Sequence, residues 1–438
     1  MDRARSLLAI LSLLAGGPVA AQERPTVVVT PGTQHQYRVA VQRFADFSTQ
    51  PDSSRASTFR RDLIRALDFA SVFVSIDLGA FLGPEVTEAA EAPPVCSDWA
   101  QIGADVLVKG EIRNTAERSE AEFSVWDTVR CRMLLHRVHH APAGDSRIAA
   151  RRIADDLAEE FTGVRGVAAT ELAYVSDRSG TPEIYVMETD GGNRRPVTSN
   201  GSINNFPSWS PDGKSILYTS YQLGNRPRLY LSSRGRGRPG PLLPRVASDL
   251  PQYRAVFDPT GRNLALVLSA EGAADIFTAR ASGRRLRRLT KNRAIDIAPT
   301  WSPDGKRIAF VSDRSGSPQI YIMRADGKNI RRLTYQGTYN THPDWSPDGR
   351  WIVYETRLEG QFDIWLIDPE GSVNVPLVSH PRSDESPTWA PSGRKLAFSS
   401  TRRGAADIYI IDVSGENLRR LTSMAGSNTS PAWGPQPR

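Results

Sequence analysis

The sequence of 438 residues contains only two cysteines and only six lysines. No Cys-x-x-Cys motif or Cys/His cluster suggests a metal or redox site. Long apolar runs are also missing, because none reaches the roughly 18–20 residues that cross a bilayer. No Gly-x-Ser-x-Gly motif is present, which argues against a serine hydrolase of the α/β-hydrolase type.

The N-terminus has the pattern of a secretory signal. Arg3 and Arg5 precede an apolar run over residues 7–15, and small residues follow at 19–21. A basic, an apolar and a small-residue region in this order predict a signal peptide over residues 1–21, cleaved after Ala21. The residue directly after the cleavage site is Gln22 and not cysteine, so a lipid-modified N-terminus is not indicated. We therefore expect an exported, soluble mature protein.

The two cysteines, Cys96 and Cys131, fall in the same N-terminal region. In an oxidising compartment an even pair most often forms one disulfide, which we predict here. Two buried free thiols are the alternative.

The basic residues are unevenly distributed and are nearly all arginine. Residues 22–165 carry a net charge of about −4, and the rest of the mature chain carries +10. An exported protein rarely meets nucleic acid, so we do not expect nucleic-acid binding. The arginines recur at one place in each repeat. They could form a solvated outer face, or they could bind an acidic partner or an anionic surface.

An aromatic residue begins the same short turn six times, as in Trp301-Ser-Pro-Asp-Gly305. The first two aromatic positions are 48 residues apart, and the others follow at intervals of 44. A period of about 40–45 residues with one aromatic turn per unit is typical of β-propeller blades. The six aromatic residues are Trp209, Phe257, Trp301, Trp345, Trp389 and Trp433.

Each unit contains four short β-branched or aromatic runs separated by Pro-Asp-Gly, Arg-Ser-Gly and Asp-Gly turns, which predicts four strands per blade. The repeats begin at 172 with a second strand and end at 430–433 with a first strand. We therefore expect the C-terminal strand to complete the first blade and close a six-bladed ring. An open solenoid, the alternative, would leave two strand edges unpaired.

A polar residue lies five positions before each aromatic residue, where the first strand of the blade begins. The six residues form a predicted ring at one mouth of the central channel, outside the packed core between blades. They could cap backbone groups, form a rim that binds a partner, or hold a Ca²⁺ ion as in a propeller lactonase, the enzymatic alternative. The ring consists of Asn204, Gln252, Asp296, Asn340, Asp384 and Asn428.

The period is absent from residues 22–165, where helices and strands mix. We predict a small α/β domain here, followed by an all-β six-bladed propeller over 166–438. The predicted strands cover 27–30, 37–43, 72–76, 106–112, 120–126 and 133–138, and the predicted helices cover 58–67, 97–103 and 148–161.

This combination resembles the TolB family, the periplasmic components of the Tol-Pal system. The resemblance rests on the segment Val27-Val-Val-Thr-Pro-Gly32, the strand over 38–44, and the Ser-Asp-Arg-Ser-Gly…Ile-Tyr-x-Met pieces at 176–187 and 312–323. The blade motif alone also occurs in the propellers of prolyl-oligopeptidase-type peptidases. The second blade departs from the pattern, with Phe257-Asp-Pro-Thr-Gly261 and four extra residues upstream.

The resemblance implies a non-catalytic periplasmic scaffold without cofactor, metal or small-molecule substrate. It implies that the propeller mouth binds the lipoprotein Pal, which would associate the protein peripherally with the outer membrane. The mature N-terminal segment would bind the inner-membrane protein TolA, in a system that maintains outer-membrane integrity and invagination during cell division. The candidate Pal contacts are Asn204, Asn205, Gln252, Arg254, Asp296, Ile297, Asn340, Thr341, His342, Asp384, Glu385, Asn428 and Thr429. The candidate TolA segment runs to Gly32 and contains Gln22, Glu23, Arg24, Pro25, Thr26, Val27, Val28, Val29 and Thr30.

Overall fold

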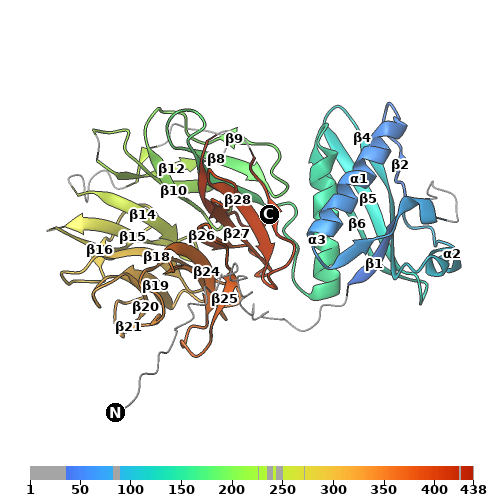
Figure 1. Cartoon of the computed structure of the whole chain (residues 1–438). Helices are drawn as coiled ribbons and strands as arrows, with labels where there is room; N and C mark the ends of the chain where they lie inside the picture. Colours follow the sequence, from blue (N-terminus) through green and yellow to red (C-terminus); the bar gives the residue numbers. More distant parts are fainter. Residues whose placement is uncertain are drawn as a thin grey trace, which may run out of the picture.

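A computed structural model describes residues 36–81, 89–224, 226–233, 240–242, 250–270, 272–423 and 426–437. A small domain of helices and a mixed sheet lies beside a larger β-propeller, and the C-terminus lies at the junction of the two (Figure 1). The predicted signal peptide and the predicted strand over 27–30 lie outside the described residues.

The N-terminal domain is built on a sheet with the strand order β3-β1-β4-β5-β6, in which β2 also pairs with β4. Strand β1 pairs in parallel with β3 and β4, whereas β4, β5 and β6 form an antiparallel meander. The strands are β1 (Tyr37–Val41), β2 (Ala45–Asp46), β3 (Phe73–Ser75), β4 (Val106–Asn114), β5 (Arg118–Asp127) and β6 (Arg132–Pro142).

Two long helices cover one face of this sheet. They are α1 (Ser53–Phe69) and α3 (Ser146–Thr162), and Figure 1 shows both between the sheet and the propeller. Asp52 caps α1 by accepting a hydrogen bond from the Ser54 amide, and Gly163, at φ 71°, ends α3. The short helix α2 (Cys96–Gln101) and the 3₁₀ turn η1 (Leu78–Ala80) complete the domain. Among the described residues, no helix has the length and apolar character needed to cross a membrane.

The rest of the structure consists of six four-stranded antiparallel sheets, as predicted. Three blades, each given from its first to its fourth strand, are β10 (Asn204–Trp209), β11 (Ser215–Ser220), β12 (Arg228–Ser233) and β13 (Gly240–Pro241); β14 (Gln252–Phe257), β15 (Asn263–Ala270), β16 (Ala273–Arg280) and β17 (Arg287–Arg288); and β18 (Asp296–Trp301), β19 (Arg307–Ser312), β20 (Gln319–Arg324) and β21 (Arg331–Arg332). The next two are β22 (Asn340–Trp345), β23 (Ile352–Leu358), β24 (Gln361–Ile367) and β25 (Asn374–Val378); and β26 (Asp384–Trp389), β27 (Lys395–Ser400), β28 (Asp407–Asp412) and β29 (Arg419–Arg420). The remaining blade combines both ends of the propeller sequence: β30 (Asn428–Trp433), β7 (Glu171–Ser176), β8 (Glu183–Glu188) and β9 (Arg195–Pro196).

The C-terminal strand closes the ring. Strand β30 pairs with β7, which joins Asn428 to Ser176 and Trp433 to Leu172 across more than 250 residues of sequence. The prediction of a ring closed by the C-terminal strand is therefore confirmed, and the open solenoid is wrong.

The repeated aromatic turns serve the packing of the blades. Trp389 packs on Val353 and Ile364 of the preceding blade, and its indole N–H donates to the Asp344 carbonyl oxygen at 3.2 Å. In the turn after Trp301, the Asp304 carboxylate accepts from the Ser302 hydroxyl at 2.5 Å and from the Lys306 amide at 3.0 Å. These hydrogen bonds hold the pKa of Asp304 below its usual value. The recurring aspartates are thus turn residues.

The two domains meet at one face of the propeller. Arg151 of α3 forms ion pairs with Glu188 at 2.8 Å and Asp190 at 2.6 Å, at the end of β8. The Lys395 ammonium, at the start of β27, donates to the Ser71 hydroxyl at 2.8 Å. Gly434 and Gln436, which follow β30, bond to Glu171 and Gly166 in the segment that leads from α3 into the propeller. The first strands of the blades therefore end at this face. The described residues of the N-terminal domain leave the opposite mouth, where the first strands begin, free, and we call it the free mouth.

Candidate functional site

The first strands of all six blades line a central channel with a cavity of about 320 Å³. The hydrogen-bond register of all six strands shifts at a β-bulge or irregularity, and in five of them the shift comes with a residue of positive φ. These five residues have a φ between 48° and 56°, a conformation that non-glycine residues seldom adopt and that is found most often near binding sites. These residues are Phe206, Ala298, His342, Ser386 and Ser430. Phe206, His342, Ser386 and Ser430 line the channel cavity.

The predicted ring of polar residues is not an exposed rim. The structure buries all six residues, Asn204, Gln252, Asp296, Asn340, Asp384 and Asn428, to 3% exposure or less. The expectation that they lie outside the core between blades is therefore wrong. Their side chains are directed into the gap between blades, because the bulge that follows breaks the alternation of the strand.

The ring residues bond to neighbouring blades or to their own turns. Asn204 donates to Glu183 Oε2 of the adjacent blade at 2.8 Å, and Asn340 donates to Gln319 Oε1 at 2.7 Å. The two ring carboxylates accept from arginines of their own blades, Asp296 from Arg314 and Asp384 from Arg402, each at 2.9 Å. The ring could cap backbone groups, bind a partner or hold Ca²⁺, and these hydrogen bonds favour a structural role of the first kind.

The residues next to the ring reach the surface or the channel more than the ring does. Of the remaining candidate contacts, Thr341 is buried, and the other six are half-buried: Asn205, Arg254, Ile297, His342, Glu385 and Thr429. A partner that approaches the free mouth would meet these side chains before it met the ring.

The channel holds charged groups in a poorly solvated setting. Burial lowers the pKa of Arg254 and raises the pKa of Asp344, although the two charges attract each other. The Asp344 carboxylate accepts from the Trp389 amide at 2.8 Å and from the Thr388 hydroxyl at 3.1 Å. Asp344 therefore links three neighbouring inner strands, since it also accepts from Thr300 at 3.3 Å.

A second set of ionisable side chains lies nearer the mouth than Arg254 and Asp344. His342 Nδ1 is 2.9 Å from Glu355 Oε1, and the other Glu355 oxygen accepts from the Ser386 amide. Burial, and then the negative charge of Glu355, raise the pKa of Glu385 beside them. Strands β22, β23 and β26 thus bring one imidazole and two carboxylates to the same part of the mouth.

Exposed apolar residues surround this mouth and were missed by the sequence analysis. Ile203, Ile295 and Tyr339 each lie immediately before a buried ring residue, with exposed fractions of 44%, 48% and 38%. Tyr335, in the same connection as Tyr339, is 73% exposed. The detectable signal was an apolar residue directly before the polar ring position in three of six repeats. Exposed apolar groups gathered around a depression are typical of protein-binding surfaces.

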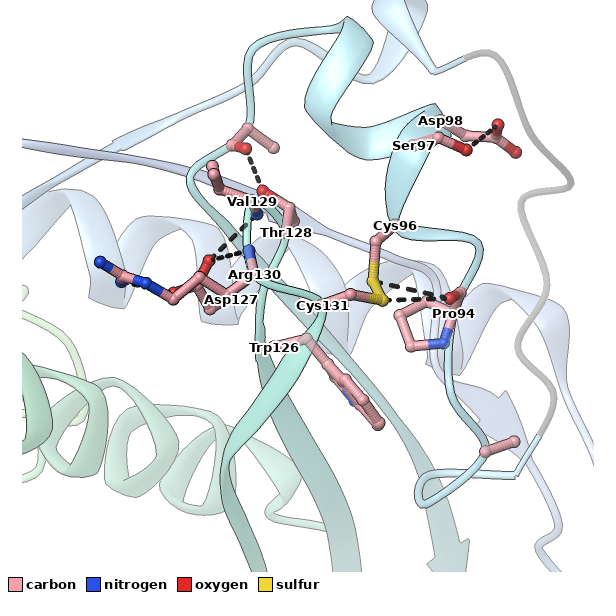
Figure 2. The surroundings of a disulfide bond; sticks show 12 residues. Pro94, Cys96, Ser97, Asp98, Trp126, Asp127, Thr128, Val129, Arg130 and Cys131 are labelled. Atoms are coloured by element: carbon pink, nitrogen blue, oxygen red, sulfur yellow. Dashed lines mark hydrogen bonds and ion pairs between the residues drawn. A yellow bond between two sulfur atoms is a disulfide. The ribbon is translucent and has the colours of Figure 1, made fainter.

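Cys96 and Cys131 form a disulfide in the structure, with their Cα atoms 5.6 Å apart (Figure 2). It joins the N-terminus of α2 to the turn between β5 and β6, on the side of the sheet away from α1 and α3. The candidate segment from Gln22 to Gly32 lies outside the described residues.

Two family models match this sequence. The TolB amino-terminal domain matches residues 25–134, and the TolB beta propeller domain matches residues 252–437, so together they cover more than half of the chain. Over 298 residues, the chain is 37% identical to the Tol-Pal system protein TolB of Anaeromyxobacter sp. (strain K). The chain belongs to the TolB family. The resemblance inferred from the blade turns and the N-terminal strands is confirmed.

The TolB relatives are matched over part of their length. The Anaeromyxobacter match covers 67% of this chain and 66% of the relative. The Tol-Pal system protein TolB of Desulfosudis oleivorans is 35% identical over 290 residues, which are 66% of this chain and 65% of that relative. The chain thus aligns with just under two thirds of each TolB relative.

The fold agrees with a solved TolB. The crystal structure of TolB from Acinetobacter baumannii superposes with a TM-score of 0.76, covering 92% of this chain and 97% of that one. At 24% identity this likeness concerns the fold. It confirms the prediction of a small α/β domain followed by a six-bladed propeller.

Proposed function

We propose that this chain is a non-catalytic scaffold of the Tol-Pal system in the periplasm. The free propeller mouth binds the lipoprotein Pal and, through Pal, the outer membrane. The mature N-terminal segment, Gln22 to Gly32, binds TolA. In this role the protein maintains outer-membrane integrity and supports invagination of the outer membrane during division.

The observation that carries the Pal proposal is the group of exposed apolar side chains at the free mouth. Ile203, Ile295 and Tyr339 offer apolar area, and the half-buried Arg254, His342 and Glu385 offer polar groups beside them. A few anchor residues that become buried on binding, often aromatic, supply most of the energy of a protein interface.

The Pal proposal is tested by calorimetric titration of the soluble domain of Pal into mature protein. We expect Tyr339→Ser and Ile295→Ser to weaken binding at least tenfold, about 1.4 kcal/mol or more each, without lowering the melting temperature. Val373→Ser is the matched control, since Val373 is 44% exposed in the β24–β25 turn, at the other face of the propeller. Equal affinities for all three variants would contradict the assignment of the mouth.

The TolA proposal is tested separately. A chain that begins after Gly32 should bind the soluble domain of Pal with unchanged affinity and should no longer bind the periplasmic domain of TolA. Retained TolA binding would show that the segment is not the TolA site.

A further inference from the structure

The face of the N-terminal sheet that α1 and α3 leave uncovered carries a cluster of ionisable groups. Glu111 of β4, Glu122 of β5 and His136 of β6 all project from this face, and Glu111 lies directly opposite Glu122 across the two strands. Like charges in such a cross-strand pair repel each other. Arg113 forms ion pairs with Glu111 and, at 3.9 Å, with Glu122, so this face already attracts cationic groups.

A fourth group comes from a segment that crosses the same face. The Ala90 carbonyl oxygen accepts from the Ser124 hydroxyl, and the Ala92 carbonyl oxygen accepts from the Lys109 ammonium at 2.7 Å. The Cys96–Cys131 disulfide fixes the far end of this segment, beside Pro94, to the β5–β6 turn (Figure 2). These contacts place Glu91, between the two bonded carbonyl groups, over His136.

Three side chains converge at this point. His136 Nε2 is 3.0 Å from Glu122 Oε1, and His136 Nδ1 is 3.4 Å from Glu91 Oε1. One ring nitrogen and one oxygen from each carboxylate all lie within 4.8 Å of one another. Ligand atoms at about 2.0–2.2 Å from a shared ion lie closer together than this, so small side-chain movements would suffice. The Glu91 side chain is 70% exposed, so it is free to make such a movement.

We propose that Glu91, Glu122 and His136 form a binding site for a divalent transition-metal ion such as Zn²⁺. One imidazole nitrogen and two carboxylate oxygens are a ligand set that suits such ions, whereas Ca²⁺ and Mg²⁺ prefer oxygen alone. Water would complete the coordination. The three ligands come from β5, β6 and the segment held by the disulfide, so the fold itself brings them together. The site lies in the N-terminal domain and does not depend on the proposed binding of Pal or TolA.

The test is calorimetric titration of the full mature chain with ZnCl₂, up to about 100 µM free ion. We expect one site per chain, with affinity reduced at least tenfold by His136→Ala and by Glu122→Gln. Glu91→Gln should also weaken binding, and its surface position makes it the variant least able to disturb folding. Melting curves without metal show that each variant is folded, and a Zn²⁺-induced rise in melting temperature should disappear in the same variants.

Two control variants separate this site from other histidines. His140→Ala, on the same strand and 3.4 Å from Glu120, should keep wild-type Zn²⁺ affinity. His342→Ala, at the channel mouth, should keep it as well. The proposal is overturned if the wild-type chain takes up no Zn²⁺, if binding survives in folded His136→Ala and Glu91→Gln proteins, or if His342→Ala removes it. In the first two cases the three side chains form ion pairs and nothing more.

Discussion

At the start of each first strand, a polar side chain turns into the gap between two blades and holds them together. Asn204 and Asn205 illustrate how much direction matters, because they are adjacent and chemically identical. Asn204 is fully buried and hydrogen-bonded to Glu183, whereas Asn205 is half-buried beside the channel mouth. The 44-residue period locates the position in each repeat. The period does not predict which way the side chain points, because that direction depends on the bulge that follows.

The adjacent asparagines give a matched pair for mutation. Asn204→Ala removes the donor to Glu183 Oε2, which leaves this buried acceptor unsatisfied. We expect a loss of about 1–3 kcal/mol in the free energy of unfolding. Asn205→Ala should change it by about 0.5 kcal/mol or less. Urea denaturation of both variants measures the difference, and equal losses would mean that the hydrogen bonds of Asn204 contribute nothing.

Asp155 makes the stability of the domain junction depend on pH. It is 2% exposed and accepts from the Ala168 and Ala169 amides at 2.6 and 3.0 Å, where α3 leads into the propeller. Burial raises its pKa to about 7, against about 3.9 in an unfolded chain. Unfolding therefore releases a proton between these values. The stabilisation is complete below about pH 4 and is lost as the pH rises to 7.

Asp155→Asn keeps the shape of the side chain and cannot ionise. Between pH 4.5 and 7.5, roughly the window set by those two pKa values, the melting temperature of the wild type should fall relative to that of the variant. The effect is about 1.4 kcal/mol for each unit by which the two pKa values differ. A constant difference between the two melting temperatures across this range would show that Asp155 titrates alike in both states.

Among the elements, those with clear periodicity could be predicted from the sequence. All five described strands and all three helices predicted in the N-terminal region exist, but α1 begins at Ser53 and not at 58. Its first turn is Ser-Ser-Arg, which lacks apolar periodicity, and only the Asp52 cap signals the start. The bulges could not be predicted, because a residue such as His342 or Ser386 gives no sequence signal for a positive φ. The exposed residues Ile203, Ile295 and Tyr339 were missed for another reason, because the apolar residue before the ring position recurs in only three of the six repeats.

Strand β30 is the element on which closure of the ring depends. A chain that ends at residue 426 lacks this strand and Trp433, so the inner edge of β7 is unpaired and the blade loses its innermost strand. We expect loss of the cooperative unfolding transition of the propeller in calorimetry. A chain that ends at Gln436 retains the strand and is the control. Should both chains unfold alike, closure by β30 contributes nothing to stability.

The disulfide is the second element whose removal has a calculable effect. It closes a loop with a sequence separation of 35 residues. Loop-closure entropy alone predicts that Cys96→Ser/Cys131→Ser lowers the free energy of unfolding by roughly 3–4 kcal/mol. Unfolded wild-type protein without reductant should show no titratable thiols. Two thiols per chain, or a double variant as stable as the wild type, would contradict a structural disulfide.

At the scale of the whole molecule, the face to which the N-terminal domain binds determines which channel mouth a partner can reach. The period and the composition predicted both domains but not this arrangement, because it depends on side chains far apart in sequence. Arg151 pairs with Glu188 and Asp190, and Lys395 bonds to Ser71. No repeat or local pattern connects these residues. The mouth was therefore predictable as a site only in outline, and its exposed residues were not.

Arg151 provides the test of how firmly the domains are joined. It is 8% exposed, and removal of its guanidinium leaves the buried Glu188 carboxylate without its ion pair, a loss that typically costs several kcal/mol. Arg151→Ala should therefore let the two domains unfold at more widely separated temperatures and should increase the radius of gyration in solution scattering. Arg152→Ala is the matched control, since Arg152 bonds to the His140 carbonyl within its own domain. If Arg151→Ala melts and scatters as Arg152→Ala does, the ion pairs are not what fixes the domains, and the contact of Lys395 with Ser71 and Phe69 becomes the interaction to remove next.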